Sequence, residues 1–578
     1  MLNRRHLLLS GSAAVLATMV PAGAKPSDEA AKMNVLFDSF INEQMEVSPE
    51  FATGLGLDKD ARAWLKSRLS EVTPVAADAN KALTASQLNR LKTINRKKLK
   101  GLDATNYDAV YYQLEQNDRA NKKFAFIGAP YVLHQLGGSY QSLPDFLDSQ
   151  HTIETKEDAD AYLARLDAFG TMMDQEAESV RHDVAMGVIP PDFVIDRTLE
   201  QMAHLRGVEA EKSPLVDSVI RRTKEKNIPG NYGAEAVGIL NNVVYPALSR
   251  QIELMKSLRP KAVHDAGIWR LPQGDELYAA ALEAQTTTTK TPEEVHQLGL
   301  EVVKDCTSQI EAIMKSQGMT NGTVGQRLRA MFDDPKFRYE NTDAAKEKLI
   351  ADLNVKIGQV QAELPAYFGA KPKAGVQVKR VPKYIEAGAP GGYYNSPSLD
   401  GSRPGFYYIN LRDTAEVPSW TLPTLTFHES IPGHHLQISI AQEAPLPMLR
   451  KISQYNAYVE GWALYAEQLA VEMGLYQNDP MGHIGQLHDA MLRGVRLVVD
   501  TGMHAKKWSR EQAIRYYADT LGDPDSGATT EIERYCVWPG QACGYMIGKI
   551  TILRLRDMAR AKLGSKFDIH KFHDTVLL

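Results

Sequence analysis

Apolar residues recur along much of the chain at the spacing of amphipathic helices. One helix is predicted to begin where Thr291 can cap the backbone, Pro292 fits the first turn and Glu294 completes a capping box. The positions that follow on its apolar face are Val295, Leu298, Val302, Ile310 and Ile313. Residues 343–368 form another long amphipathic pattern, which ends at Gly369. These patterns predict a mainly helical fold.

The pattern changes between residues 376 and 411, where Gly, Pro and aromatic residues become frequent. Residues 376–381 and 406–411 have the alternation and the β-branched or aromatic composition of short strands. The sequence therefore predicts a small sheet or a hairpin inside the helical fold.

Two halves of the chain differ in their chemistry. The N-terminal half, residues 25–285, is helical in pattern and has no catalytic motif, whereas residues 286–578 hold all the candidate site residues. With no long linker, repeat or low-complexity run between them, we expect one continuous body in which the N-terminal half forms the other wall of a cleft.

The composition is that of an ordinary globular protein, with 43% hydrophobic and 24% charged residues among 578. The net charge is −5, and no basic patch interleaved with aromatic residues is present, which argues against a nucleic-acid partner. Cys306, Cys536 and Cys543 lack the spacing of a zinc cluster, so we expect free, buried thiols.

Residues 1–24 have the pattern of a twin-arginine export signal. Arg4 and Arg5 precede an apolar stretch that is too short to span a membrane, and an A-x-A cleavage site ends at Ala24. No cysteine lies near this cleavage point, so we expect no lipid or membrane anchor after signal removal. The predicted location is the periplasm.

The strongest candidate for chemistry lies at residues 427–437, FHESIPGHHLQ. Zinc peptidases often carry H-E-x-x-H on a helix, which places both imidazoles on one face. Here Pro432 occupies the position of the second histidine. Because Pro432 breaks the hydrogen-bond ladder and Gly433 is flexible, a bulge of two extra residues could bring His434 to that place. His435 would need three extra residues and is the second choice; the alternative is a helix end with a surface histidine pair.

A second candidate element is the predicted helix at residues 453–475, which is apolar on several sides and therefore buried. Glu460 lies on this helix, and a buried carboxylate needs a cation or another partner. Gly461 would let another backbone or a ligand approach closely. Glu467, two turns later, is the alternative ligand.

These motifs resemble known families. A His-Glu pair followed by Glu-Gly-aromatic-Ala is similar to the gluzincin zinc peptidases, and H-E-x-x-P-G-H-H resembles the signature of the bacterial domain-of-unknown-function 885 family. Further segments that match this family are residues 394–397, 403–410, 500–504, 534–535 and 539–541. The resemblance implies a large helical gluzincin-like body with a deep cleft. It also implies zinc ligands His428, His434 and Glu460, with Glu429 as the general base.

Other residues are candidates for further roles at the site. Related peptidases use Tyr or His to stabilise the oxyanion, for which Tyr535 and His504 are the candidates, although a packed core role is equally open. Arg534 could bind a substrate carboxylate or form a structural ion pair. The strand at residues 406–411, with Tyr408 and Asn410, could bind substrate backbone by strand addition, as the edge strand of gluzincins does, or belong to a structural hairpin.

The sequence thus predicts an exported zinc metallohydrolase, most readily a peptidase that acts on peptides or small amides. Three protein ligands leave a position for water, which marks catalytic zinc sites. The rivals are a zinc hydrolase of a non-peptide amide or ester, and a metal-free binding or scaffold protein with a degenerate motif. Oligomeric state and endo- or exo-action are open at this stage.

Overall fold

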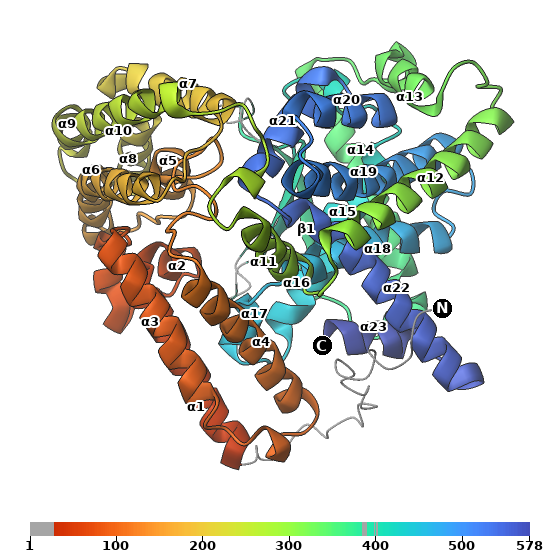
Figure 1. Cartoon of the computed structure of the whole chain (residues 1–578), viewed down its shortest axis with the longest axis horizontal. Helices are drawn as coiled ribbons and strands as arrows, with labels where there is room; N and C mark the ends of the chain where they lie inside the picture. The colour runs from red at the N-terminus through yellow and green to blue at the C-terminus, as the bar shows by residue number, and fades with distance from the viewer. Residues whose placement is uncertain (1–27, 384–385, 387–389, 398, 400–402) are drawn as a thin grey trace.

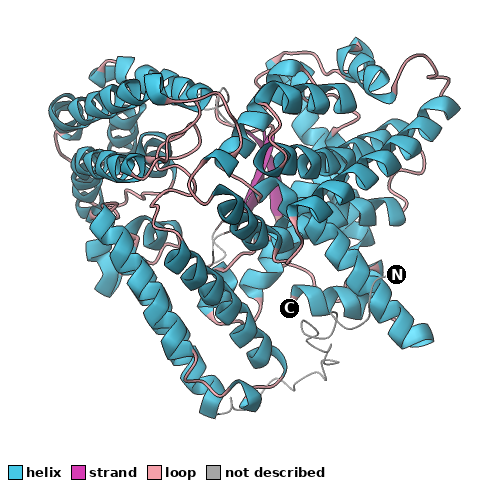
Figure 2. Ribbon diagram, viewed as in Figure 1, coloured by secondary structure: helices cyan, strands magenta, loops and turns pink. Residues whose placement is uncertain are grey.

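The computed structural model describes residues 28–383, 386, 390–397, 399 and 403–578 (Figure 1). Within this part the chain is mainly helical with one small sheet, which confirms the predicted fold class in its coarse form (Figure 2). The predicted export signal, residues 1–24, lies outside the described residues. A gluzincin-like body with a deep cleft stays a prediction.

The N-terminal helices form two groups on one side of the molecule (Figure 1). The first group has its own apolar core around Phe37, Phe40 and Leu91. Its helices are α1 (Asp28–Val47), α2 (Pro49–Gly54), α3 (Pro74–Leu91) and α4 (Gly101–Lys123). The second group packs around α6, whose residues Leu166, Phe169 and Met173 are fully buried. Its helices are α5 (Ser139–Ser149), α6 (Lys156–Ala185), α7 (Asp192–Gly207), α8 (Pro214–Glu225), α9 (Tyr232–Ile239) and α10 (Tyr245–Leu258).

The C-terminal half is a larger helical assembly in which α12 and α19 pack along each other. Thr291 caps α12 with Glu294 in the predicted capping box. Gly299 and Gly494 allow the close approach, because a Cβ on Gly299 would lie 2.9 Å from the Gly494 carbonyl oxygen. The helices outside the site are α11 (Gly274–Thr286), α12 (Pro292–Ser316), α13 (Val324–Asp333), α14 (Asp343–Glu363), α19 (Pro480–Ala505), α20 (Arg510–Leu521), α21 (Asp525–Val537) and α23 (Ile569–Leu577).

The sheet has three strands in the order β1-β3-β2. β1 (Val376–Arg380) runs parallel to β3 (Gly405–Ile409), and β2 (Gly392–Asn395) runs antiparallel to it. The two predicted strands are therefore confirmed, but they do not form a hairpin with each other, and β2 was not predicted. Since β3 is paired on both sides, the expectation that residues 406–411 offer a free edge for strand addition is wrong.

β2 is an outer strand of this sheet, with no further strand paired to it among the described residues. Asn410 donates its backbone N–H to the Gly391 carbonyl, so residues 391, 393 and 395 face β3 in the antiparallel register. The backbone groups of Gly392 and Tyr394 consequently point to the outer side of the sheet.

The first N-terminal group contacts the C-terminal half through α4. The Tyr455 hydroxyl donates to the Ala109 carbonyl of α4, and Arg450 donates to Asn106 at 3.3 Å. Tyr455 and Arg450 flank the connection into the helix that carries Glu460.

All three cysteines are free and buried, as predicted. Among the described helices, none is long and apolar enough to cross a membrane.

Candidate metal centre

The predicted motif lies across two helices. α15 (Leu422–Glu429) ends directly after His428 and Glu429, and α16 (His434–Glu443) begins at His434. The four residues between them form a turn that is closed by a hydrogen bond from the His435 N–H to the Ser430 carbonyl, at 3.0 Å. The bulge within one continuous helix is therefore wrong, because the helix stops and a new one starts. The outcome for His434 is the predicted one: it is brought back to His428.

Gly433 explains why this turn can be so tight. A Cβ at this position would lie 2.0 Å from the His428 carbonyl oxygen and 2.3 Å from that of Phe427. Only glycine fits against the end of α15. Trp462 fixes the turn from the opposite side, because its indole N–H donates to the Pro432 carbonyl at 2.9 Å.

Trp462 belongs to α18 (Asn456–Glu472), the buried helix that also carries Glu460. As predicted, Gly461 admits another backbone, which is that of α22 (Gly544–Leu563). A Cβ on Gly461 would lie 2.5 Å from the Gly548 Cα, and one on Gly548 would lie 1.9 Å from the Ala457 carbonyl oxygen. The two helices therefore meet backbone to backbone beside Glu460.

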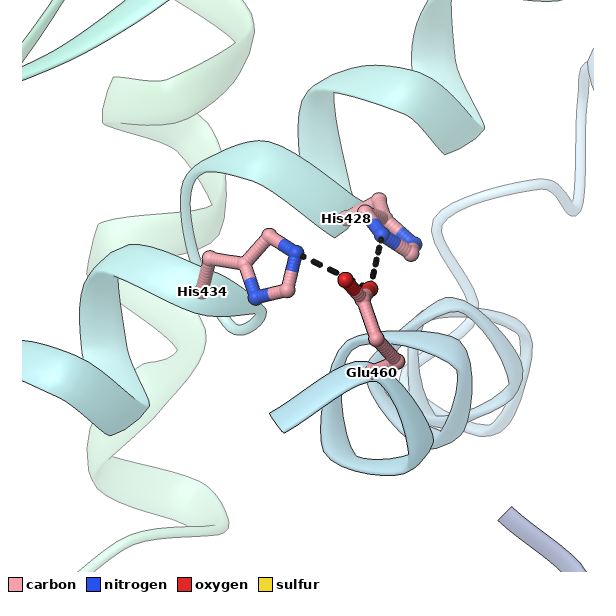
Figure 3. A group of neighbouring side chains, drawn as sticks. All are labelled: His428, His434 and Glu460. Atoms are coloured by element: carbon pink, nitrogen blue, oxygen red, sulfur yellow. Dashed lines mark ion pairs between the residues drawn. The ribbon is translucent and has the colours of Figure 1, made fainter. Parts of the chain in front are cut away.

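His428, His434 and Glu460 converge on one point (Figure 3). The Glu460 Oε2 atom lies 3.6 Å from His428 Nε2 and 3.4 Å from His434 Nε2. The imidazole rings are 4.7 Å apart between centroids and stand at 89° to each other. The candidate ligand atoms all lie within 4.8 Å of one another. This group could hold a metal ion.

Unsatisfied atoms in the group fit that interpretation. In the described part of the chain, Glu460 Oε2 and His434 Nδ1 are buried without a hydrogen-bond partner. A buried carboxylate oxygen without a donor is costly, and a cation between the three side chains would remove that cost. Two imidazoles and one carboxylate are a donor set typical of zinc.

Glu467 binds the ring nitrogen of His428 that is not directed at the other candidate ligands. Its Oε1 atom accepts from His428 Nδ1 at 2.7 Å, and its Oε2 atom accepts from the Thr424 hydroxyl at 2.9 Å. A proton held on Nδ1 leaves the Nε2 lone pair free, which is how outer carboxylates orient metal-binding histidines. Burial raises the pKa of Glu467 to about 7, with Asp489 contributing. Glu467 thus orients His428, which is one of the three candidate ligands.

A second possible group, His428 with Glu467 and Asp489, shares the same histidine. Asp489 is already in an ion pair with Arg493, and Glu467 is bonded to His428 and Thr424. Its acids therefore have hydrogen-bond or ion-pair partners, whereas Glu460 Oε2 of the first group accepts no hydrogen bond among the described residues. Burial alone would lower the pKa of His428, but Glu460 and Glu467 together raise it well above its usual range.

Glu429 lies beside the group as the last residue of α15. It is only 7% exposed, and it is not one of the candidate ligand residues. Its carboxylate is consequently available to accept a proton.

His435 turns away from the group. Its Nε2–H donates to the Ala374 carbonyl at 3.0 Å, so Nδ1 accepts from the Tyr394 hydroxyl at 2.8 Å. Burial lowers the pKa of His435 to about 4, which keeps the imidazole neutral. This histidine ties α16 to β2 and to the segment before β1.

The two predicted oxyanion donors are not part of this group. His504 accepts from the Ile268 N–H through Nδ1 at 3.1 Å and donates to the Tyr535 carbonyl through Nε2 at 3.0 Å. The Tyr535 hydroxyl donates to Glu531 at 2.5 Å and accepts from Arg496 at 2.9 Å. Both ring nitrogens of His504 and the Tyr535 hydroxyl are thus engaged within the protein, and a role for these residues toward an oxyanion stays a prediction.

The predicted substrate-binding residues lie in different surroundings. Tyr408 stacks on Tyr393 of β2 at 5.0 Å, and the Asn410 amide donates to the Glu386 carbonyl at 2.8 Å. Arg534 is 20% exposed at its side chain and donates to Gln541 at 3.3 Å. Their roles toward a substrate stay predictions.

Tyr545, on the first turn of α22, is a site neighbour that the sequence reasoning missed. Its ring lies 6.5 Å from that of His428 at an interplanar angle of 21°. Its position shortly after the segment 539–541 is the signal that could have pointed to it.

Comparisons with known proteins agree with the motif. The model of the family described as "Bacterial protein of unknown function (DUF885)" matches residues 49–578. A protein of Colwellia psychrerythraea, named a "putative lipoprotein", has a crystal structure that superposes with a TM-score of 0.92 at 34% identity, covering 96% of this chain and 97% of that one.

A second structure, of a Shewanella oneidensis protein named a "putative lipoprotein of unknown function", is similar in fold, with a TM-score of 0.72 at 16% identity. It covers 94% of this chain and 96% of that one. No curated protein matches. The length of the family match and the 34% identity over nearly the whole chain show that this protein belongs to the bacterial DUF885 family.

Proposed function

We propose that this protein is a zinc-dependent hydrolase of amide bonds, with peptides as its substrates. The observation that carries the proposal is the convergence of His428, His434 and Glu460 on one point, beside a carboxylate, Glu429, that is not one of the candidate ligands. Catalytic zinc sites combine three protein ligands with a separate acid–base residue in this way.

Each residue has a distinct task. A bound zinc ion would supply Lewis acidity and acidify water. His428, His434 and Glu460 would hold the ion, and Glu467 would keep the Nε2 lone pair of His428 directed at it. Glu429 would accept the proton from the attacking water on its carboxylate and pass it to the leaving nitrogen. The free edge of β2, rather than β3, is the strand suited to binding an extended substrate backbone.

The proposed site of action is the cell envelope. The two structural relatives are named as lipoproteins, which points to export in the family. For this chain we propose the twin-arginine route, because of Arg4 and Arg5. Replacing both with lysine should leave unprocessed protein in the cytoplasm; normal processing of that variant would indicate the general secretory route instead.

The central test combines metal analysis with one substitution. Purified protein should contain about one zinc ion per chain after reconstitution. Glu429→Gln should keep that zinc but lower the rate of peptide hydrolysis by about 10²- to 10⁴-fold, the usual contribution of a general base. Glu301→Gln, which changes an exposed glutamate of α12, is the matched control and should have wild-type activity.

Two results would contradict the proposal. Protein that binds no zinc after reconstitution would favour a metal-free binding protein. The second result is protein that binds zinc and hydrolyses esters or non-peptide amides, but hydrolyses no peptide in a diverse mixture analysed by mass spectrometry. The proposed metal site would then stand, and the proposed substrate class would be wrong.

A further inference from the structure

Three arginines surround Tyr545, next to the candidate metal centre. Arg493 and Arg496, one turn apart on α19, place their guanidinium carbons 5.5 and 4.7 Å from the centre of the Tyr545 ring. Arg534, on α21, stacks on the neighbouring Tyr535 at 5.2 Å and interacts electrostatically with Arg496 and Tyr545. We call Arg493, Arg496 and Arg534 the arginine cluster.

The arginine cluster has more positive than negative charge. Arg493 pairs with Asp489, while Arg496 at 2.9 Å and Arg534 at 3.8 Å share the single carboxylate of Glu531. Lys549, one turn beyond Tyr545 on α22, is also buried and interacts electrostatically with Glu467 and Asp489. The three arginines and Lys549 thus have three carboxylates between them, those of Asp489, Glu531 and Glu467.

The hydrogen bonding of the cluster is incomplete as well. Arg493 Nε, Arg496 Nη1 and Arg534 Nε are buried without an acceptor among the described residues. Buried guanidinium groups are normally fully paired, because leaving an N–H unsatisfied in the interior is costly. An additional anion beside the cluster would lower that cost.

The cluster also lies at a useful distance from the metal centre. Tyr545 contacts both, because its ring centre lies 6.5 Å from that of His428 and 4.7 Å from the Arg496 guanidinium carbon. Since an extended chain advances about 3.3–3.6 Å per residue, a chain of one or two residues spans the step from the His428 ring to the Tyr545 ring. Tyr545 is 9% exposed, and Arg534 is the most exposed of the three arginines.

We propose that the arginine cluster and the Tyr545 hydroxyl bind the C-terminal carboxylate of the substrate, so that the enzyme removes one or two residues from the C-terminus of peptides. The inference rests on the proposed function. A carboxylate fits because guanidinium groups bind it through paired, charge-assisted hydrogen bonds, and because every unmodified peptide ends in one.

The test uses two peptides of the same sequence, one with a free C-terminal carboxylate and one with a C-terminal amide. We expect kcat/KM to be at least about tenfold higher for the free acid, the effect of one charge-assisted hydrogen bond, with cleavage one or two residues from its end. A third peptide, amidated but with Asp as its last residue, distinguishes a side-chain carboxylate from the terminal one.

Arg534→Ala should reduce the ratio between the acid and the amide from about tenfold to less than about threefold, and Arg534→Lys should give an intermediate ratio because it keeps the charge but loses the planar fork. Arg515→Ala, which changes an exposed arginine of α20, should leave the ratio as in the wild type. Thermal unfolding of each variant checks that the fold is intact.

The outcomes separate the two proposals. If no peptide is hydrolysed by zinc-loaded protein, the proposed function itself is wrong. If acid and amide are hydrolysed equally, or if Arg534→Ala keeps the wild-type ratio, the hydrolase stands and carboxylate recognition by the cluster is overturned. Preference for the amidated Asp peptide over the free acid would also overturn the C-terminal assignment.

Discussion

The second N-terminal group and the metal centre both bury charged side chains, but the two regions pair these charges differently. In the N-terminal group, Arg165 is fully buried and its Nε and Nη2 atoms donate to the Arg68 carbonyl and the Thr53 hydroxyl at 2.9 and 2.8 Å. Glu176 accepts from the Ser139 backbone and hydroxyl, both at 2.6 Å, and from Gln251 at 2.9 Å. Each of these charges is satisfied by the fold itself.

At the metal centre the corresponding atoms lack partners. Within the described residues, Glu460 Oε2 and His434 Nδ1 are buried with no hydrogen bond. The contrast teaches that burial of a charged residue says little about function by itself, since Arg165 and Glu176 are structural. A site is indicated where burial is combined with incomplete pairing and with side chains converging from separate helices.

The largest expected effect separates two adjacent histidines. His434→Ala should lose nearly all bound zinc, because it removes one of three ligands, whereas His435→Ala should keep it and be less stable, because the bonds to Tyr394 and Ala374 are lost. Elemental analysis after dialysis against a weak chelator gives the comparison. Zinc retained by His434→Ala and lost by His435→Ala would place the second ligand at position 435.

The next largest effect is expected in the second N-terminal group, where the buried charges have hydrogen-bond partners. Arg165→Met should lower the free energy of unfolding by about 3 kcal/mol or more, because several buried acceptors lose their donor at once. Its zinc content should be normal. Arg181→Met changes an exposed arginine of the same helix and should have little effect on either. Zinc loss in Arg165→Met would show that the two regions are coupled.

A smaller effect is expected from the turn. Gly433→Ala forces a methyl group against the Phe427 and His428 carbonyls, which should cost about 1–3 kcal/mol of stability and weaken zinc binding. Gly358→Ala, at an exposed and open position of α14, should instead stabilise the protein by up to about 1 kcal/mol. Urea unfolding and a zinc competition assay measure both; equal behaviour of the two variants would contradict the role of Gly433.

The smallest expected effect tests the hydrogen bond between His428 and Glu467. Glu467→Gln keeps the shape of the side chain but weakens its hold on His428 Nδ1, so zinc affinity should fall by about 10- to 100-fold without loss of stoichiometry at saturating zinc. Competition with a chromogenic chelator measures the change. Complete loss of the site would instead mean that Glu467 is itself a ligand, as in the second possible group.

The sequence was informative where function depends on residue type. The family resemblance implied the set His428, His434 and Glu460, while the residues alone left His435 and Glu467 open as alternatives, and the structure brings the implied set together. The capped start of α12 was predicted because local hydrogen bonding determines it. Glu467 was noticed only as an alternative ligand, although its position two turns after Glu460 places it on the same face of α18.

Other features depend on contacts between distant segments, which the sequence does not display. Whether Pro432 produces a bulge or a helix break depends on Trp462, thirty residues away, which bonds to its carbonyl. β2 is four residues long and is defined by pairing with β3 rather than by its own pattern. Tyr545 becomes a neighbour of His428 only through the packing of α22 on α18.

The contact between Gly461 and Gly548 has a consequence for how this protein can change. Glu460 directly precedes one of these glycines, and Tyr545 comes three residues before the other. The spacing between the proposed ligand and the proposed carboxylate site is therefore set by two main chains in contact, with no side chain between them that could be traded for a larger or smaller one. Laboratory evolution of new substrate lengths should accordingly leave this crossing untouched and find its solutions on α19 and α21, where the arginines can be exchanged one at a time.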